Sequence, residues 1–285
     1  MSAIDAYVSN EPLISNSAPG KDVFAKILGV PFDFTSSFRP GSRFGPNSLR
    51  NAFMNIEIYS HTLNIDLEKL SYLDLGNLQT ADVMLMVKRV EEVVKEVVPA
   101  HKMAIMGGEH SITYGAFAAM PEETSLLIFD AHFDLRDELL DLKFSHATYL
   151  RRLLEVRKPK NVMVVGVRAG IQEEWEQAAK EGIQTITMDE IMNKSVGSRL
   201  EDFVGKSEKL YVSIDLDVLD PATAPGVGNP EPNGLSSKQL LAYLYTLREA
   251  DILGFDIVEL CPPYDNGSTA TLAAKLMAEM LCIAQ

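Results

Sequence analysis

Cysteine is scarce in this sequence, and long apolar runs are absent from it. Two cysteines, Cys261 and Cys282, stand among 285 residues. They are too few for a disulfide framework, so we expect a reducing, cytoplasmic environment. Residues 1–20 are small and polar rather than basic and then apolar, so we expect no secretory signal peptide. No apolar run reaches the ~20 residues that a membrane-spanning helix needs, and we therefore expect no membrane partner.

Basic residues are few relative to acidic ones. The 26 Lys and Arg against 40 Asp and Glu give a formal net charge of −14 at pH 7. Such a chain repels nucleic-acid phosphates, whose binding depends on neutralisation by basic side chains, so we expect no nucleic-acid partner. The acidic excess favours a small cationic molecule if carboxylates converge on a pocket. With 46% hydrophobic and 23% charged residues, the composition is globular and excludes a fibre or a disordered chain.

Short, continuously apolar segments alternate with segments of helical periodicity. Continuous rather than alternating apolar residues are typical of strands buried on both faces of a parallel sheet. The apolar segments are residues 24–30, 103–106, 125–132, 161–167, 184–188, 210–216 and 252–260. The helical segments are residues 82–98, 147–156, 173–181, 236–250 and 269–282. The pattern predicts a three-layer αβα fold with a doubly wound, mostly parallel sheet. We expect one domain over residues 1–285, with residues 1–20 as a loosely ordered extension.

One motif places three potential metal ligands directly after an apolar segment. It is Asp130-Ala-His132-Phe-Asp134, preceded by Leu-Leu-Ile-Phe. In extended backbone, residues two apart share a face, so we expect the three polar side chains to point the same way. Their charges would be uncompensated against a core unless a cation neutralised them. A solvated strand end, where acidic residues only cap the backbone, is the alternative.

Two further motifs follow apolar segments in the same manner. Asp215 and Asp217 lie in Ser-Ile-Asp-Leu-Asp-Val-Leu-Asp-Pro, and His110 follows a Gly-Gly pair that permits a tight turn. Ligands of such sheets bind beyond the carboxyl ends of the strands. The combined set is two histidines and four aspartates: His110, Asp130, His132, Asp134, Asp215 and Asp217. This set exceeds the needs of one tetrahedral zinc and suits two harder ions such as Mn²⁺. Two metals ~3.5–4 Å apart favour hydrolysis, because a water that they share loses a proton readily.

With these motifs the sequence resembles the ureohydrolases, the arginase and agmatinase superfamily of binuclear manganese enzymes. Segments 29–33 (Gly-Val-Pro-Phe-Asp), 39–46 (Arg-Pro-Gly-Ser-Arg-Phe-Gly-Pro) and 256–260 (Asp-Ile-Val-Glu-Leu) match as well, so the resemblance covers most of the chain. It implies the arginase-like fold and two Mn²⁺ per subunit, bound by the six residues above, with Asp130 and Asp215 bridging the ions. It also implies a homo-oligomer, a trimer or a hexamer.

The resemblance assigns catalytic roles to three residues. His146, in Phe-Ser-His-Ala-Thr, is the counterpart of the family's proton shuttle, and Glu259 is that of the glutamate that pairs with the substrate guanidinium. Asp134 would orient the attacking hydroxide. The implied reaction is attack of a metal-bridging hydroxide on a guanidinium carbon, which releases urea and an amine. For His146 and Glu259, a surface or core role is the alternative.

The segment after the Asp-Ala-His motif bears on the substrate. Residues 135–143 hold three acids, Asp137, Glu138 and Asp141, against two bases, which suits a distal ammonium better than an α-carboxylate. The segment resembles those of microbial agmatinases. We therefore expect hydrolysis of agmatine to urea and putrescine, a reaction of polyamine biosynthesis, with Asp137 in substrate binding. A solvated loop unrelated to specificity is the alternative.

Other functions remain open at this point. Arginase, N1-aminopropylagmatine ureohydrolase, guanidinobutyrase and formimidoylglutamase share the metal motifs. A carboxylate-bearing substrate would need a base at the cavity mouth, and Arg39, Arg43 and Arg168 are the candidates, although a structural role is favoured for each. Metal-dependent deacetylases of the same fold need fewer ligands. A non-catalytic metal-bound scaffold is disfavoured, because every presumed ligand is present.

One departure from the family follows Glu259. Many members have Asn-Pro at this point, whereas this chain has Cys261-Pro-Pro. We expect altered packing rather than lost catalysis, because a thiol fills a similar space. A nucleophilic cysteine is disfavoured, since no histidine lies nearby in the sequence.

Overall fold

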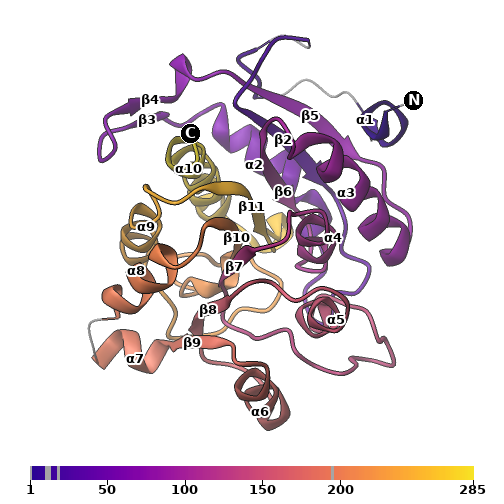
Figure 1. The fold of residues 1–285 in the computed structure, drawn as a ribbon, viewed down its shortest axis with the longest axis vertical. Helices are drawn as coiled ribbons and strands as arrows, with labels where there is room; N and C mark the ends of the chain where they lie inside the picture. The colour runs from indigo at the N-terminus through magenta and orange to yellow at the C-terminus, as the bar shows by residue number, and fades with distance from the viewer. Residues whose placement is uncertain (1, 10–13, 18–19, 194–195) are drawn as a thin grey trace.

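The central sheet is nine-stranded within residues 2–9, 14–17, 20–193 and 196–285, which the computed structural model describes (Figure 1). Its strand order is β1-β5-β2-β6-β11-β10-β7-β8-β9. All neighbours pair in parallel except β1 with β5. The strands are β1 (Val8–Ser9), β2 (Ala25–Val30), β5 (Tyr72–Leu78), β6 (Lys102–Gly107), β7 (Thr124–Phe129), β8 (Val162–Val167), β9 (Gln184–Thr187), β10 (Lys209–Asp215) and β11 (Ile252–Val258). A small hairpin pairs β3 (Tyr59–Ser60) with β4 (Ile65–Asp66).

Helices cover both faces of this sheet. In Figure 1, α3, α4 and α5 lie on one side, and α8, α9 and α10 lie on the other. The helices are α1 (Ala3–Tyr7), α2 (Gly45–Phe53), α3 (Val83–Val97), α4 (Ile112–Ala118), α5 (Tyr149–Val156), α6 (Gln172–Glu181), α7 (Met188–Asn193), α8 (Gly197–Gly205), α9 (Ser237–Tyr245) and α10 (Ser268–Ile283). Two hydrophobic cores result, one on each face. This arrangement confirms the predicted three-layer αβα fold.

The strands form where the apolar segments predict them. Every residue of β7 and of β8 is buried, which explains why neither segment alternates between apolar and polar residues. Strand β5 was not predicted, because Asp74 and Asn77 interrupt its apolar run. The structure compensates this buried carboxylate: Arg50 of α2 donates from Nε and Nη2 to the two oxygens of Asp74, at 2.8 Å each. A charge pair of this kind is invisible in the sequence.

Part of the N-terminal segment packs against the body of the fold. Val8 and Ser9 pair antiparallel with the end of β5, and the backbone N–H of Ala3 donates to Glu96 of α3. The prediction of a loosely ordered extension over residues 1–20 includes residues 1, 10–13 and 18–19, which lie outside the described residues. Among the helices that the structure describes, none combines the length and the apolar character needed to cross a membrane.

The sheet brings four strand ends together. Strands β6, β11, β10 and β7 are consecutive neighbours at its centre, and all four are parallel. Their carboxyl ends therefore lie along one edge. The segments that follow them contain all three metal motifs and Glu259.

Candidate metal centre

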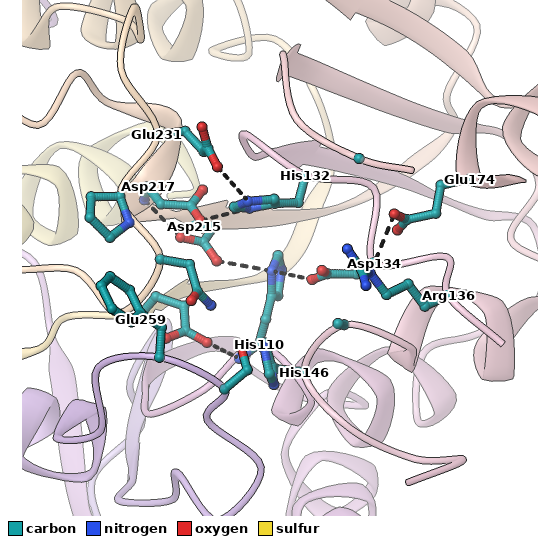
Figure 2. Close-up of a pocket in the computed structure, with 16 residues that line it drawn as sticks. His110, His132, Asp134, Arg136, His146, Glu174, Asp215, Asp217, Glu231 and Glu259 are labelled. Atoms are coloured by element: carbon teal, nitrogen blue, oxygen red, sulfur yellow. Dashed lines mark hydrogen bonds and ion pairs between the residues drawn. The ribbon is translucent and has the colours of Figure 1, made fainter. Parts of the chain in front are cut away.

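Residues at and beyond the carboxyl ends of the four central strands line a cavity of about 350 Å³ at this edge. Asp215 is the last residue of β10, Glu259 follows β11 directly, and His110 lies shortly after β6. Figure 2 shows the imidazoles of His110 and His132 among the carboxylates of Asp134, Asp215, Asp217 and Glu231. The structure thus gathers side chains that are up to 149 positions apart in the sequence.

Nδ1 of His110 faces three carboxylates. It lies 3.0 Å from Asp130 Oδ2, 3.2 Å from Asp134 Oδ2 and 3.1 Å from Asp215 Oδ2. Asp134 and Asp215 approach the ring from opposite sides (Figure 2). This nitrogen is buried and has no hydrogen-bond partner in the described part of the chain. Three acceptor oxygens around one buried nitrogen require a shared cation, either protons or a metal ion.

A second group of ligands lies around His132. Its Nδ1 is 2.9 Å from Asp217 Oδ2 and 3.6 Å from Asp130 Oδ1. Asp130 therefore directs one carboxylate oxygen to each histidine. Two sets of ligand atoms are each close enough to hold one metal ion, and they share Asp130: His110, Asp130 and Asp134, and Asp130, His132 and Asp217. This geometry fits the bridging role that the resemblance implies for Asp130.

Asp215 lies beside both groups. One oxygen faces His110, and the other accepts the backbone N–H of Asp217 at 2.7 Å, which caps the short 3₁₀ turn at Leu216–Val218. The carboxylate is thereby fixed in place. Its predicted role as a second bridge remains a prediction.

The reason given above for the convergence of Asp130, His132 and Asp134 is wrong. Strand β7 ends at Phe129, so these residues do not alternate along an extended strand. Instead, the Asp130 carboxylate accepts the N–H of His132 at 2.6 Å, and the backbone of Asp134 turns into the left-handed region with φ 55°. Glu259 is left-handed as well, with φ 64°. Such strain costs about 1–3 kcal/mol per residue, and two of the residues that carry it are candidate catalytic residues.

The electrostatics of the cluster also call for a cation. Burial, together with the charge of Asp130, raises the pKa of Asp134 to about 7, and burial with Asp217 and Asp130 raises the pKa of Asp215 well above its usual value. Burial alone would lower the pKa of His110, but Tyr149 and the adjacent aspartates raise it well above the ordinary value. Without a metal the site therefore retains protons. Carboxylate oxygens with two imidazoles suit a pair of ions such as Mn²⁺.

Hydrogen bonds behind His110 leave its Nδ1 available for a metal. Nε2 lies 2.9 Å from Ser213 Oγ and 3.0 Å from the hydroxyl of Tyr149. The Ser213 hydroxyl donates to buried Asp256 at 2.6 Å, so its oxygen accepts the Nε2–H of His110. The lone pair then lies on Nδ1, toward the carboxylates. Such second-layer hydrogen bonds orient metal-bound histidines.

Manganese affinity is expected to rise with pH through about 7, and to keep rising above it while the other ligands with raised pKa values hold protons. Below that pH Asp134 holds a proton, which a metal must displace, at a cost of about tenfold in affinity per pH unit. The raised pKa also means that the metal-free protein loses stability as pH rises from about 4 to 7, because the folded state prefers the protonated acid. Calorimetric titration with Mn²⁺ between about pH 6 and pH 8 checks the first effect. An affinity independent of pH over this range would contradict it.

His146 and Glu259 both line the cavity. Glu259 Oε1 accepts the backbone N–H of His110 at 2.9 Å, and burial with the charge of Glu109 raises the pKa of Glu259 well above its usual value. Burial and the two metal-site histidines lower the pKa of His146 to about 4. Their positions agree with the predicted roles in substrate binding and proton transfer, and the roles themselves remain predictions.

Asp137 does not line the cavity. Lys143 contacts its carboxylate at 2.7 Å and Arg152 at 2.9 Å, and these two groups lower the pKa of Asp137 to about 2. Two glutamates that sequence analysis missed do line the cavity, Glu174 and Glu231. Neither follows a strand of the sheet, so neither stood out as a site residue. Direct contact of Asp137 with substrate remains a prediction without support from this geometry.

The two cavity glutamates differ in their surroundings. Glu174 is buried, accepts the backbone N–H groups of Leu135 and Ile171, and lies 3.5 Å from Arg136 Nε. Its negative charge is already compensated. Glu231 is partly exposed, and its Oε1 lies 3.9 Å from His132 Nε2 (Figure 2). Glu231 is therefore better placed to meet a second positive charge on a ligand.

None of the three arginines considered for a carboxylate lines the cavity, and each contacts other protein groups, which agrees with the structural role favoured for them. Arg168 donates to backbone carbonyls on both sides of the site, including those of Asp217 and Glu231 at 2.7 Å each. Arg43 pairs with Asp33 at 2.7 Å. Arg39 lies over the rings of Phe38 and Tyr264.

Cys261 is buried and packs beside the cavity wall. Its thiol donates to the backbone carbonyl of Arg39 at 3.4 Å, and burial raises its pKa to about 12. A thiol that stays protonated is a poor nucleophile. Burial and a protonated thiol agree with the packing role expected for Cys261, which remains a prediction.

Known proteins resemble this chain over nearly its whole length. Residues 24–282 match the profile of the arginase family. An agmatinase of Halalkalibacterium halodurans is 37% identical over 288 residues, which cover 97% of each protein. The N(1)-aminopropylagmatine ureohydrolase of Thermococcus kodakarensis is 34% identical over 257 residues, covering 88% of this chain and 87% of that protein. The crystal structure of agmatine ureohydrolase of Thermoplasma volcanium has a TM-score of 0.89 at 35% identity and covers 97% of this chain and 95% of its own.

Proposed function

The chain belongs to the arginase family, whose members named above are hydrolases of guanidino compounds, and we propose that it converts agmatine to urea and putrescine. One observation carries this proposal: two metal-ligand groups share Asp130, and Glu259 lies beside them in the same cavity. That arrangement suits hydrolysis of a cation held next to a metal pair. The agmatinase relatives favour agmatine, while the Thermococcus relative keeps N1-aminopropylagmatine as the second candidate.

The metal centre would consist of two Mn²⁺. When bound, the pair would lower the pKa of a shared water, so that hydroxide is available at neutral pH. The residues that would hold the pair are those predicted from the sequence: His110, Asp130, His132, Asp134, Asp215 and Asp217. Assembly into a trimer or a hexamer remains a prediction from the resemblance.

Each remaining side chain then has a task that its position allows. Glu259, buried in the cavity wall, would pair with the guanidinium and fix its plane. One of its oxygens is held by the N–H of His110, and the other lies next to Gly228, where a side chain would come within 3.1 Å of it. Gly228 thus leaves room for the guanidinium. Asp134 would accept a hydrogen bond from the attacking oxygen, and His146 would carry a proton to the leaving amine.

The proposal is tested by a substrate comparison. Urea release by Mn²⁺-loaded protein is measured with agmatine, N1-aminopropylagmatine, L-arginine and 4-guanidinobutyrate at equal concentrations, with putrescine assayed for the agmatine reaction. We expect the highest kcat/KM for agmatine. A higher value for arginine or guanidinobutyrate would refute the substrate, and absence of urea from all four would refute the reaction.

Glu231 and Asp137 offer competing sites for the distal ammonium of agmatine. We expect Glu231→Gln to raise KM for agmatine about 1.5- to fivefold, since a partly exposed ion pair contributes about 0.2–1 kcal/mol. Asp137→Asn should leave KM unchanged, because Lys143 and Arg152 already occupy that carboxylate. Steady-state kinetics of both variants decide between them. The reverse result, a raised KM only for Asp137→Asn, would restore the prediction made from the sequence.

A further inference from the structure

A chain of hydrogen bonds leads from a buried carboxylate to the imidazole of His146. The carboxylate belongs to Glu109, which is fully buried next to His110 in the sequence. Its Oε1 accepts the hydroxyls of Thr35 and Ser111 at 2.6 Å each, and its Oε2 accepts the backbone N–H of Thr35 at 2.8 Å. The Thr35 hydroxyl in turn lies 3.2 Å from Nδ1 of His146. Neither Glu109 nor Thr35 has a role in the mechanism proposed above.

The position of the Thr35 hydroxyl proton determines the direction of the hydrogen bonds between Glu109, Thr35 and His146. The Thr35 hydroxyl has a single proton and three neighbours. Its oxygen lies 2.6 Å from Glu109 Oε1, 3.0 Å from the backbone nitrogen of His146 and 3.2 Å from Nδ1 of the His146 ring. The shortest of these contacts is to the carboxylate oxygen, which can only accept, so the proton is donated to Glu109. The two lone pairs of the hydroxyl oxygen then face the backbone N–H and Nδ1. Nδ1 must therefore carry the hydrogen.

This assignment leaves a free lone pair on Nε2 of His146. Nε2 lies 3.3 Å from the hydroxyl of Ser37, and both residues line the cavity that holds Asp134 and Glu259. A neutral imidazole with hydrogen on Nδ1 can take a proton only at Nε2. The ring is thus held with its basic nitrogen toward the reacting groups, which is the orientation that a proton shuttle needs.

We propose that Glu109 and Thr35 are positioning residues that hold His146 in its Nδ1–H form, so that protons enter and leave the ring at Nε2. This inference rests on the proposed function, in which His146 transfers a proton to the leaving amine. Nε2 takes a proton from the water side of the cavity and becomes N–H, while Nδ1 keeps its hydrogen. The same proton passes from Nε2 to the departing amine nitrogen as the carbon–nitrogen bond breaks, which returns the ring to its neutral form.

A similar series of carboxylate, hydroxyl and imidazole involves His110, but there the hydrogen lies on the other ring nitrogen, Nε2. There a serine hydroxyl donates to Asp256 and accepts Nε2–H, which leaves the lone pair on Nδ1. In both cases a buried carboxylate fixes a hydroxyl, and the hydroxyl fixes an imidazole. The protein thereby prepares one histidine to bind metal through Nδ1 and the other to exchange protons through Nε2.

The first test removes the Thr35 hydroxyl without changing the size of the side chain. In Thr35→Val we expect kcat for agmatine to fall at least about tenfold, as for a misoriented acid–base group, with KM and bound Mn²⁺ nearly unchanged. Thr35→Ser should restore most of the turnover. Thr246→Val, the same change at a threonine whose hydroxyl donates to the backbone carbonyl of Tyr243 in α9, is the matched control and should turn over normally.

A double-mutant cycle separates positioning from a merely structural role. In a His146→Ala background, Thr35→Val should lower kcat no further, because the effect of Thr35 acts through His146. An equal loss in both backgrounds, or no loss with intact His146, would overturn the proposal. If the substrate comparison shows activity only on another guanidino compound, the same double-mutant cycle is run with that compound. Failure of the substrate assignment and failure of the positioning role then remain distinct.

A spectroscopic measurement determines the protonated ring nitrogen in the unmutated chain, and a variant serves only to assign the signals. The ¹⁵N spectrum of histidine-labelled protein loaded with diamagnetic Zn²⁺ reports which ring nitrogen carries hydrogen, and His146→Ala identifies the signals. We expect a protonated Nδ1 and an unprotonated Nε2 for His146 at neutral pH. Hydrogen on Nε2 instead would contradict the proposal.

Discussion

Replacing Asp130 with asparagine should abolish the proposed metal centre and lower urea release by at least about 1,000-fold, since the metal pair would supply several kcal/mol of transition-state stabilisation. Asp130 Oδ2 lies 3.0 Å from His110 Nδ1, and Oδ1 lies 3.6 Å from His132 Nδ1. An asparagine presents one neutral oxygen and one N–H donor, so it cannot serve both groups. Bound manganese, measured by elemental analysis, should fall together with activity.

The matched control for Asp130→Asn is Asp251→Asn, the same change at an exposed aspartate that contacts Lys102. It should keep wild-type manganese and activity. An Asp130→Asn protein that retained two manganese ions per chain would show that the carboxylate does not bridge. Retention of one ion with little activity would still agree with loss of the shared ligand.

Replacing Glu259 with glutamine should preserve the metals and lower kcat/KM for agmatine by about 150- to 5,000-fold. Loss of one partner from a buried ion pair costs about 3–5 kcal/mol, because the remaining charge stays buried and unpaired. The guanidinium would face this cost, while the glutamine oxygen could still accept the N–H of His110. Steady-state kinetics and elemental analysis on one preparation separate substrate binding from metal binding.

Glu249→Gln, at an exposed glutamate, is the control for Glu259→Gln. Its kinetics should match those of the unmutated protein. If Glu259→Gln lost manganese as well as activity, the side chain would support the metal centre rather than the substrate. If kcat/KM changed less than about tenfold, a buried guanidinium partner would be excluded.

The fold could be predicted because its central strands are buried on both faces. β7 and β8 are continuous apolar runs, and helix α3 carries its apolar residues on one side. Strand β5 escaped prediction because Asp74 and Asn77 interrupt its apolar run, and the sequence does not show that Asp74 pairs with Arg50. Short helices such as α4, with seven residues, are too brief to show a periodic pattern.

The site could be predicted in part, because its motifs directly follow strands. The strand order decides which strands meet at the centre of the sheet, and therefore which motifs converge. The sequence does not state this order. The left-handed turn at Asp134 was not foreseen, since extended geometry was assumed. The contacts of Thr35 with Glu109 and His146 span 74 and 111 positions, so no local pattern could indicate them.

The central claim is that two metal ions share Asp130 at the carboxyl ends of β6, β7 and β10. A crystal of the Mn²⁺-loaded protein, measured at the manganese absorption edge, tests it most directly. We predict two anomalous peaks about 3.5–4 Å apart, one bonded to Nδ1 of His110 and one to Nδ1 of His132, with Asp130 contacting both. A single peak, or two peaks that share no carboxylate, would contradict the claim.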